Sequence, residues 1–405
     1  MKKTKFATSM ALLVGTTATF AGPVTTVPWN GNTGAVSFTY DDGRPSQLTN
    51  LVPQLDNLGI KVTFFLAYGI YNFPGNESQW TAVAKKGHEL ANHTYDHNTP
   101  TSTNVVQMAT VLRGMDPSIE AVSFAYPNCT VTNESYVSAE AFIGRGCGST
   151  TYAWGTQPSD WENVQGLIVT SSNISPATTL INSAKSGNSW AVILNHDVET
   201  SGSDIYYLTP TDNQTMLNSA ITAKVWVAPY GTVGAYYRAH FTMDAVTASG
   251  SGPTWNLTWT SPHPKMPKSV MLKVKLDANT FGSSPVVTQG GTAVAANSDG
   301  SFTIDFMKLA MTISKTGSTG LLVDGSIPAS LRGSEVGDGL VLSGLPVGSY
   351  RLEFRTLSGA ILSSSTIQST SAQPITVSSP VHGRSVLVVL SRKGAKDFSA
   401  PVWVP

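Results

Sequence analysis

The chain has 405 residues, and its 25 basic and 25 acidic side chains give a formal net charge of zero. A protein without a basic surface lacks the attraction that binds nucleic-acid phosphates, so we exclude nucleic acid as its main partner. Charged residues make up 12% of the sequence. Since a typical share is about 25%, the surface must be largely neutral and polar, which suits neutral glycans. The length predicts about two or three domains.

The N-terminus has the pattern of an export signal. Three lysines within the first five residues precede an apolar run at 10–14 and small residues that end at Ala21. This order is typical of a secretory signal peptide, which we expect to span residues 1–21 and to be cut near Ala21. The apolar run is shorter than the roughly 20 residues of a membrane-spanning helix, so we expect no transmembrane segment. The mature protein is then secreted, periplasmic or on the cell surface, with an uncleaved N-terminal anchor as the alternative.

Strand-like and helical patterns alternate through the first half of the chain. We expect strands at 35–40, 61–67 and 88–91 and helices at 45–58 and 79–86. Repeated strand–helix–strand units predict a mainly parallel sheet with covering helices, either open or closed into a barrel. In such folds the active-site residues lie at the carboxyl ends of the strands.

Beyond residue 241 the helical period disappears. Short alternating strands predict a β-sandwich-like module at 241–314, a linker at 315–320 and a further small β module at 321–405. The last module resembles the small β-sandwich domains that end many exported bacterial proteins, and this resemblance implies a role in sorting or cell-surface attachment. Trp255, Trp259 and Tyr350 are candidates either for a carbohydrate-binding platform or for the cores of these modules.

Two cysteines, Cys129 and Cys147, are the only ones in the chain. In an exported protein the oxidising compartment allows a disulfide between them. The alternative is a pair of small buried thiols.

Two adjacent carboxylates, Asp41 and Asp42, directly follow the first predicted strand and precede Gly43. Neighbouring carboxylates repel each other, so a nearby cation is expected to offset them. Successive side chains of a strand point to opposite faces. Both carboxylates can therefore serve one site only if the backbone turns at Gly43, where a positive φ is permitted.

Histidines follow two further strands. His93 and His97 are four residues apart, a spacing that places both on one face of a helix. Together with one carboxylate they would form a two-histidine, one-carboxylate set for a divalent ion with open coordination positions. His196 follows an apolar run at 192–194 and is a candidate proton donor.

These motifs, in this order, resemble those of the polysaccharide deacetylase family, also called the NodB-homology or carbohydrate esterase family four enzymes. Residues 39–43 are similar to its first motif and 93–97 to its second, while 124–128 and 194–196 resemble the third and fifth. The resemblance covers residues 33–240, and we assign 30–240 to the domain. It implies an α/β fold, a distorted (β/α) barrel of fewer than eight units, followed by the small β-sandwich-like modules.

The resemblance also implies roles for the polar residues. Asp42, His93 and His97 would hold a divalent ion, with Zn²⁺ as the first choice and Co²⁺, Ni²⁺ or Mn²⁺ as ions that accept the same ligands. Asp41 would be the general base and His196 the general acid in the hydrolysis of an acetyl group by a metal-activated water.

Four further residues are expected to bind substrate, namely Tyr126, Asn128, Trp161 and Leu194. Asn128 follows the proline of the third motif, where the family supplies a backbone N–H to the oxyanion. Tyr152 and Trp154 would either stack on sugar faces or belong to the core.

The third motif departs from the family pattern. Ala125 stands where the family usually has an arginine that orients the base aspartate, and Asn128 replaces the usual aromatic residue. Asp160 and Trp161 stand for the fourth motif, although in the family that aspartate commonly partners the missing arginine. The orientation of Asp41 must therefore come from another residue.

The sequence thus predicts a metal-dependent hydrolase that removes acetyl groups from acetylated xylan or an N-acetylglucosamine polymer. The main alternative is a non-catalytic glycan-binding protein on a deacetylase scaffold, which the missing arginine would favour. A second alternative is a surface protein whose barrel only presents the C-terminal modules. The three differ in whether the chain binds a divalent ion and releases acetate.

Overall fold

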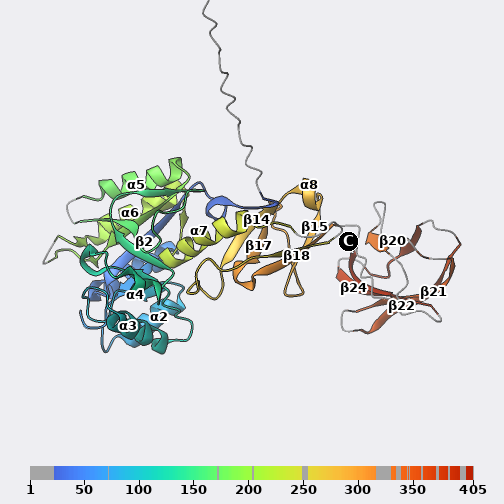
Figure 1. The fold of residues 1–405 in the computed structure, drawn as a ribbon, viewed down its shortest axis with the longest axis horizontal. Coiled ribbons are helices and arrows are strands. Elements are labelled where there is room, and N and C mark those ends of the chain that lie inside the picture. The colour runs from blue at the N-terminus through green and yellow to red at the C-terminus, as the bar shows by residue number, and fades with distance from the viewer. Residues whose placement is uncertain are drawn as a thin grey trace, which may run out of the picture.

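A computed structural model describes residues 22–315, apart from 72, 171–172, 203–204 and 249–253, and, with further short gaps, residues 330–404. Figure 1 shows a helix-rich domain followed by two regions built mainly of strands. The expected signal peptide at 1–21 and most of the expected linker at 315–320 lie outside the described residues. In the described part of the chain, no helix combines the length and the apolar character needed to cross a membrane.

The first domain is a closed barrel, which in the described residues has seven parallel strands. Its strands, in barrel order, are β2 (Ala35–Asp42), β3 (Thr63–Leu66), β4 (Glu89–Asn92), β5 (Ser123–Ala125), β6 (Ile143–Cys147), β8 (Val164–Ile168) and β9 (Ser189–Asn195). Parallel pairing of β9 with β2 closes the ring. The expected distorted (β/α) barrel is therefore confirmed, and the choice between an open and a closed sheet is settled by this pairing.

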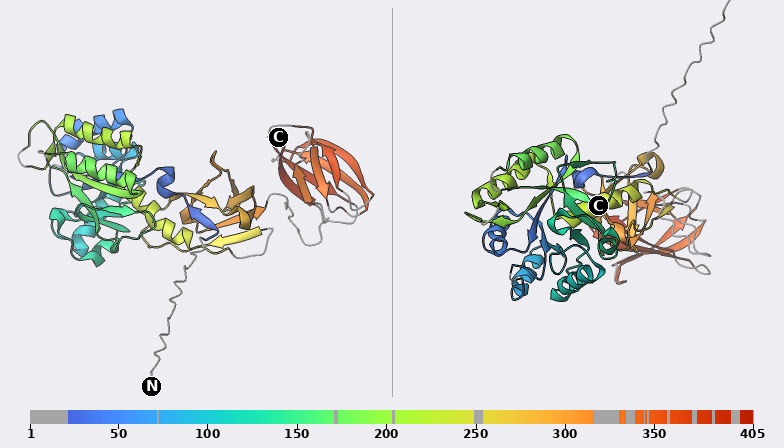
Figure 2. Two further views of the ribbon diagram at one scale, coloured as in Figure 1. Left: turned by 90° about the horizontal axis from the view of Figure 1, so that it is seen from above. Right: turned by 60° about the vertical axis from the view of Figure 1, so that its left-hand side comes forward.

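Helices surround the barrel, as the right-hand view of Figure 2 shows. They are α1 (Val52–Leu58), α2 (Glu77–Lys85), α3 (Ser102–Met115), α4 (Glu134–Ser138), α5 (Ser175–Ser186), α6 (Pro210–Ala223) and α7 (Tyr230–Asp244). The helix expected at 45–58 begins as a π-helical segment, Gln47–Leu51, and ends at Gly59 with φ 67°. Glycine suits this position because the left-handed conformation has no steric cost without a Cβ.

Minor strands complete this domain. They are β7 (Thr151–Ala153), antiparallel to β9, the pair β10 (Asp197–Val198) and β11 (Tyr207–Leu208), and β12 (Trp226–Val227) beside β2. Strand alternation divides the barrel side chains into two sets. Val36 and Phe38 of β2 pack outward under the helices, whereas Phe65 and Ala125 belong to the interior cluster.

The second region is a pair of small antiparallel sheets, which matches the expected sandwich-like module. One sheet has the order β1 (Val24–Thr26), β14 (Met271–Leu276), β17 (Phe302–Asp305). The other has the order β13 (Thr254–Thr258), β18 (Ala310–Lys315), β15 (Pro285–Gln289), β16 (Thr292–Val294). The short helix α8 (Ala278–Phe281) follows β14. Strand β1 precedes the barrel in sequence but pairs with β14, so the expected boundary at 241 does not separate two independent segments.

The core of this module continues into the barrel. Trp255 and Leu272 belong to the same buried cluster as Tyr236 of α7 and Trp190 of β9. Trp255 and Trp259 are only 6% and 8% exposed. The core interpretation of these tryptophans therefore holds, and the alternative of a carbohydrate platform is wrong for them.

The third region has a core of its own. Its strands are β19 (Ser330–Gly333), β20 (Gly339–Ser343), β21 (Gly348–Arg355), β22 (Ile361–Ser369), β23 (Ile375–Ser378), β24 (Arg384–Ser391) and β25 (Phe398–Val404), arranged in two antiparallel sheets. Tyr350 is 1% exposed and packs with Leu340 and Val388. It too is a core residue and not part of a binding platform.

A buried histidine on α7 should make the stability of the protein depend on pH. His240 is 1% exposed and stacks on Trp154 with ring centroids 4.0 Å apart. Burial lowers its pKa to about 4. Since the unfolded chain has a histidine pKa of about 6.5, it binds the proton more readily below that pH, and stability falls as the pH drops from about 6.5 to about 4.

We therefore expect His240→Phe to reduce the stability difference between pH 7 and pH 5 by up to about 2 kcal/mol. Urea unfolding at both pH values measures this difference. Phe241→Leu, next in the chain, is the packing control and should lower stability equally at both. An unchanged pH dependence in His240→Phe would show that another group is responsible.

Candidate active site and metal centre

The two adjacent aspartates end β2 and are both nearly buried. The backbone turns there as the sequence required, with φ 77° at Asp42 and 73° at Gly43. Asp42 itself adopts the left-handed conformation, which is uncommon for a residue with a side chain and is often found at functional sites. This turn allows both carboxylates to approach the same histidine: Nε2 of His93 lies 3.8 Å from Oδ2 of Asp41 and 3.5 Å from Oδ1 of Asp42.

A guanidinium lies beside Asp42, as charge repulsion between the aspartates suggested. Nε of Arg44 is 2.9 Å from Oδ2 of Asp42, and its Nη1 is 2.5 Å from Oδ2 of Asp197. Ser46 Oγ donates to the other oxygen of Asp197 at 2.5 Å. The sequence analysis missed Arg44 and Asp197, although Arg44 directly follows the Asp-Asp-Gly motif. Their contacts hold one oxygen of Asp42 and leave Oδ1 for another partner.

The two histidines of the second motif do not lie on a helix, so that part of the prediction is wrong. They belong to an irregular loop after β4 in which Thr94 and His97 have φ 61° and 56°. Their rings nevertheless meet, with centroids 4.9 Å apart. Side-chain hydrogen bonds replace helical ones in this loop. Oδ1 of Asn92 accepts from the backbone N–H of Thr94, and Oδ1 of Asp96 accepts from the backbone N–H of Asn98 and from Nδ2 of Asn104.

The ring of His93 is oriented for metal binding. Its Nδ1 lies 2.8 Å from the carbonyl oxygen of Ala125. A carbonyl only accepts hydrogen bonds, so Nδ1 carries the proton and Nε2 of the neutral ring presents a lone pair. That lone pair faces Oδ1 of Asp42, a buried oxygen without a hydrogen-bond partner in the described residues. Two electron-rich atoms in this arrangement call for a cation between them.

The distances fit a divalent ion. Oδ1 of Asp42 lies 3.5 Å from Nε2 of His93 and 3.2 Å from Nε2 of His97. Tetrahedral zinc ligands at about 2.0–2.1 Å from the ion are separated by roughly 3.3–3.4 Å. One ligand atom from each of the three residues lies within 4.8 Å of the others.

His196 follows β9 at the same rim of the barrel. Its Nδ1 is buried and has no hydrogen-bond partner among the described residues. Burial lowers the pKa of His196, while the nearby charges of Asp41 and Asp42 act to raise it. The ring lies 5.2 Å from that of Tyr206, measured between centroids. The structure thus brings this histidine to the aspartates, as the sequence predicted.

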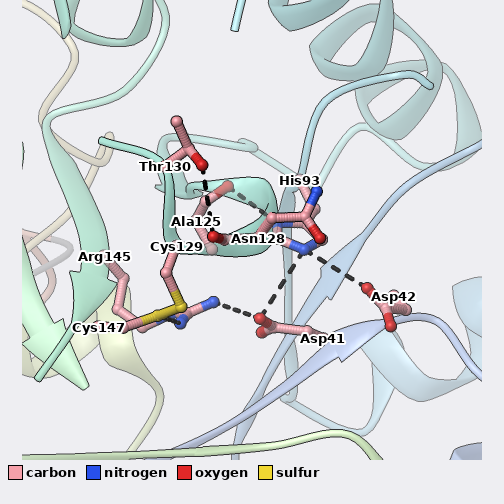
Figure 3. The surroundings of a disulfide bond; sticks show 9 residues. All are labelled: Asp41, Asp42, His93, Ala125, Asn128, Cys129, Thr130, Arg145 and Cys147. Atoms are coloured by element: carbon pink, nitrogen blue, oxygen red, sulfur yellow. Dashed lines mark hydrogen bonds and ion pairs between the residues drawn. A yellow bond between two sulfur atoms is a disulfide. The ribbon is translucent and has the colours of Figure 1, made fainter. Parts of the chain in front are cut away.

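The residue that contacts Asp41 in place of the missing arginine is Arg145. Its Nη2 forms an ion pair with Oδ2 of Asp41, which Figure 3 shows beside His93 and Asp42. Arg145 lies on β6, next to Ala125 on β5. The sequence analysis missed Arg145. The only signal for it was a single charged residue within the apolar segment 141–147.

Cys129 and Cys147 form a disulfide, so the alternative of two free thiols is wrong. The bridge connects a short 3₁₀ turn, Pro127–Cys129, with the end of β6. Asn128 lies in this turn with φ 52°, and Figure 3 shows it beside His93. Asn128 is exposed, and the expected contact of its backbone N–H with the oxyanion stays a prediction.

Tyr126 does not face the site, so its predicted substrate contact is wrong. Its side chain is 1% exposed and packs with Phe124 and Val137 in a separate cluster under α3 and α4. The reason is strand alternation: Ala125 points into the barrel, and the next side chain therefore points outward. Leu194, also 1% exposed, lies two residues before His196 on β9. Its substrate contact stays a prediction.

Trp161 is at the other end of the barrel, and its predicted place in the substrate pocket is also wrong. It precedes β8, whereas the site lies where strands end. Its ring packs against Tyr237 and Phe241 and lies under the guanidinium of Arg238. Trp154 joins the same aromatic cluster. The hydroxyl of Tyr152 accepts a hydrogen bond from the backbone of β8, and its ring packs near Trp190.

We expect Trp161→Leu to lower the free energy of unfolding by about 1–3 kcal/mol, because packing against Tyr237 and Phe241 is lost. For the polysaccharide substrate that the sequence predicts, the KM should stay unchanged. Urea unfolding and steady-state kinetics on one preparation test both parts. A several-fold rise in KM at unchanged stability would instead show that Trp161 contacts the substrate.

The chain is similar to known proteins over the barrel domain. The family model for polysaccharide deacetylase matches residues 30–139 and confirms the predicted resemblance. A gellan lyase from Bacillus sp. is 22% identical over 56% of this chain, and a bifunctional xylanase/deacetylase from Pseudobutyrivibrio xylanivorans is 25% identical over 42%. The matched stretches cover 10% and 26% of these relatives.

A solved structure of a putative polysaccharide deacetylase from Mycobacterium smegmatis is 15% identical. The match covers 57% of this chain and 99% of that one, with a TM-score of 0.41.

Proposed function

We propose that this chain, whose barrel carries the polysaccharide deacetylase match, removes acetyl groups from a polysaccharide in a reaction that requires a divalent ion. The observation that carries the proposal is the buried Oδ1 of Asp42, which faces the Nε2 atoms of His93 and His97 and has no hydrogen-bond partner among the described residues. Zn²⁺ is the first candidate, and Co²⁺, Ni²⁺ and Mn²⁺ accept the same ligands.

A divalent ion bound by these three residues would lower the pKa of water and polarise the acetyl carbonyl. Asp41 accepts the proton of the attacking water at Oδ1, since its other oxygen is paired with Arg145. The backbone N–H of Asn128 donates to the oxyanion. His196 gives a proton to the departing amine or alcohol, which completes the hydrolysis.

The glycan-binding alternative was suggested by the missing arginine at Ala125 and by the appended β modules. Arg145 offsets that loss because it contacts Asp41 directly. We therefore favour an active enzyme on acetylated xylan or an N-acetylglucosamine polymer. Its site would lie outside the cytoplasm after removal of residues 1–21, and residues 321–405 would serve in sorting or attachment.

The test is acetate release from acetylated xylan and from chitin oligomers by the purified mature protein with added Zn²⁺ or Co²⁺. Release that chelation removes and metal restores supports the proposal and identifies the substrate class. Metal binding without acetate release from either polymer would favour the glycan-binding alternative. The absence of metal binding would contradict both the metal centre and the mechanism.

A further inference from the structure

Arg145 occupies a space that its neighbours leave for it. It lies directly opposite Ala125 in the register of β5 and β6, so the two side chains share the interior face of the barrel. The methyl group of Ala125 leaves room on that side. On the other side is Gly166 of β8, where a Cβ would come within 3.0 Å of Cδ of Arg145. The sequence therefore has small residues on both strands that flank β6.

Arg145 is buried and forms its ion pair with Asp41 alone among the described residues. Arg145 is fully buried, and its guanidinium lies 5.3 Å from the ring centroid of Phe65. Asp41 is the one carboxylate paired with it among the described residues. A buried arginine without such a partner would be strongly destabilising. The pair holds Oδ2 of Asp41 and leaves Oδ1, which has no hydrogen-bond partner in the described residues, open to the site.

The disulfide lies against the same arginine. Nη1 of Arg145 is 3.8 Å from Sγ of Cys147, and Cys147 is bonded to Cys129, the residue after Asn128. A continuous covalent path therefore runs from the turn that holds Asn128 to the strand that holds the arginine. Figure 3 shows Asn128, the disulfide and Arg145 together with Asp41 and His93.

We propose that Arg145 of β6 is the positioning residue for Asp41 and takes the place of an arginine at position 125. In this proposal the Cys129–Cys147 disulfide fixes the position of Arg145 relative to the turn that holds Asn128. This inference rests on the proposed deacetylase function. It assigns the orientation of the base to a residue outside the recognised motifs. It also gives the disulfide a role in the geometry of the reaction in addition to stability.

The experiment compares three variants with the active wild-type enzyme. Arg145→Met removes the charge at similar length and should lower kcat about 100-fold, the effect expected for a misplaced reacting group, with KM and Co²⁺ affinity retained. Arg145→Lys should retain part of the activity. The double variant Ala125→Arg/Arg145→Ala moves the arginine back to β5 and should recover kcat above that of Arg145→Met.

Added guanidinium ion provides a readout that a purely structural role would not produce. It should raise the kcat of Arg145→Ala and leave that of the wild type unchanged. Wild-type kcat in Arg145→Met would overturn the inference. The inference would also be overturned if neither guanidinium nor the relocated arginine raised kcat. This holds even if Arg145→Met does not fold, because both rescue tests use other variants. A wild-type protein that releases no acetate would instead contradict the proposed function.

The disulfide arm uses Cys129→Ser/Cys147→Ser, assayed at a temperature where circular dichroism shows it folded. We expect a lower kcat at unchanged Co²⁺ affinity, because Asn128 and Arg145 are no longer held at fixed positions relative to each other. Wild-type kcat in this folded variant would overturn the coupling between the disulfide and the site.

Discussion

Asp41→Asn should abolish measurable acetate release while the protein still binds Zn²⁺. The amide has almost the shape of the carboxylate but cannot accept the proton of water, and loss of a general base costs about 10²–10⁴-fold in rate. The ion ligands Asp42, His93 and His97 are unchanged, so the affinity for the ion should stay within a few-fold. The variant tests chemistry separately from metal binding because these two neighbouring aspartates have different contacts.

The substitution also leaves Arg145 buried without a charged partner, which is expected to lower stability by about 3–5 kcal/mol. Kinetics must therefore be measured well below the unfolding temperature. Asp56→Asn, which removes an exposed ion pair with Lys86, is the matched control and should retain full activity. Retention of more than a tenth of the wild-type kcat in Asp41→Asn would assign the base to another residue.

His97→Ala should abolish both activity and stabilisation by metal. His97 supplies one of three ligands, and even loss of a supporting outer contact commonly costs 10–100-fold in metal affinity, so loss of a ligand should cost at least about 100-fold. An ion present at about 100 times its dissociation constant stabilises the folded state by about 2.7 kcal/mol. The wild type should therefore melt at a higher temperature with Zn²⁺ than with a chelator, and the variant should not.

His263→Gln is the control for this prediction, because His263 is a histidine in the second region that contacts Ser138 and lies outside the site. It should keep the thermal shift with Zn²⁺ and the full rate of acetate release. A metal-dependent shift that persists in His97→Ala but disappears in His263→Gln would place the ion elsewhere.

The polar residues of the site could be predicted from the sequence because each lies at the end of a strand or directly after it, and in a parallel barrel the strands end at one rim. Asp41, Asp42, His93 and His196 all satisfy this condition. Arg145 does not stand out in this way, because its role depends on the register that sets it beside Ala125. Register comes from packing around the whole ring and cannot be inferred from a local pattern.

The wrong predictions have physical reasons of the same kind. The spacing of His93 and His97 is helical, but polar side chains from Asn92 and Asp96 hold the loop in another conformation. Trp161 was assigned because Asp160-Trp161 stood for the fourth motif of the family, yet it precedes β8 and so lies at the opposite end of the barrel. A motif in the sequence does not show whether its residues precede a strand or follow one. Only the fold shows at which end of the barrel they lie.

The pairing of β1 with β14 has a consequence for the order in which this protein folds during synthesis. Residues 24–26 are made before the barrel, but their partners at 271–276 are made only after it. Contacts between segments so distant in sequence form slowly, because a long loop must first close. The first sheet of the second region can therefore be completed only after the barrel and residues 271–276 have been made.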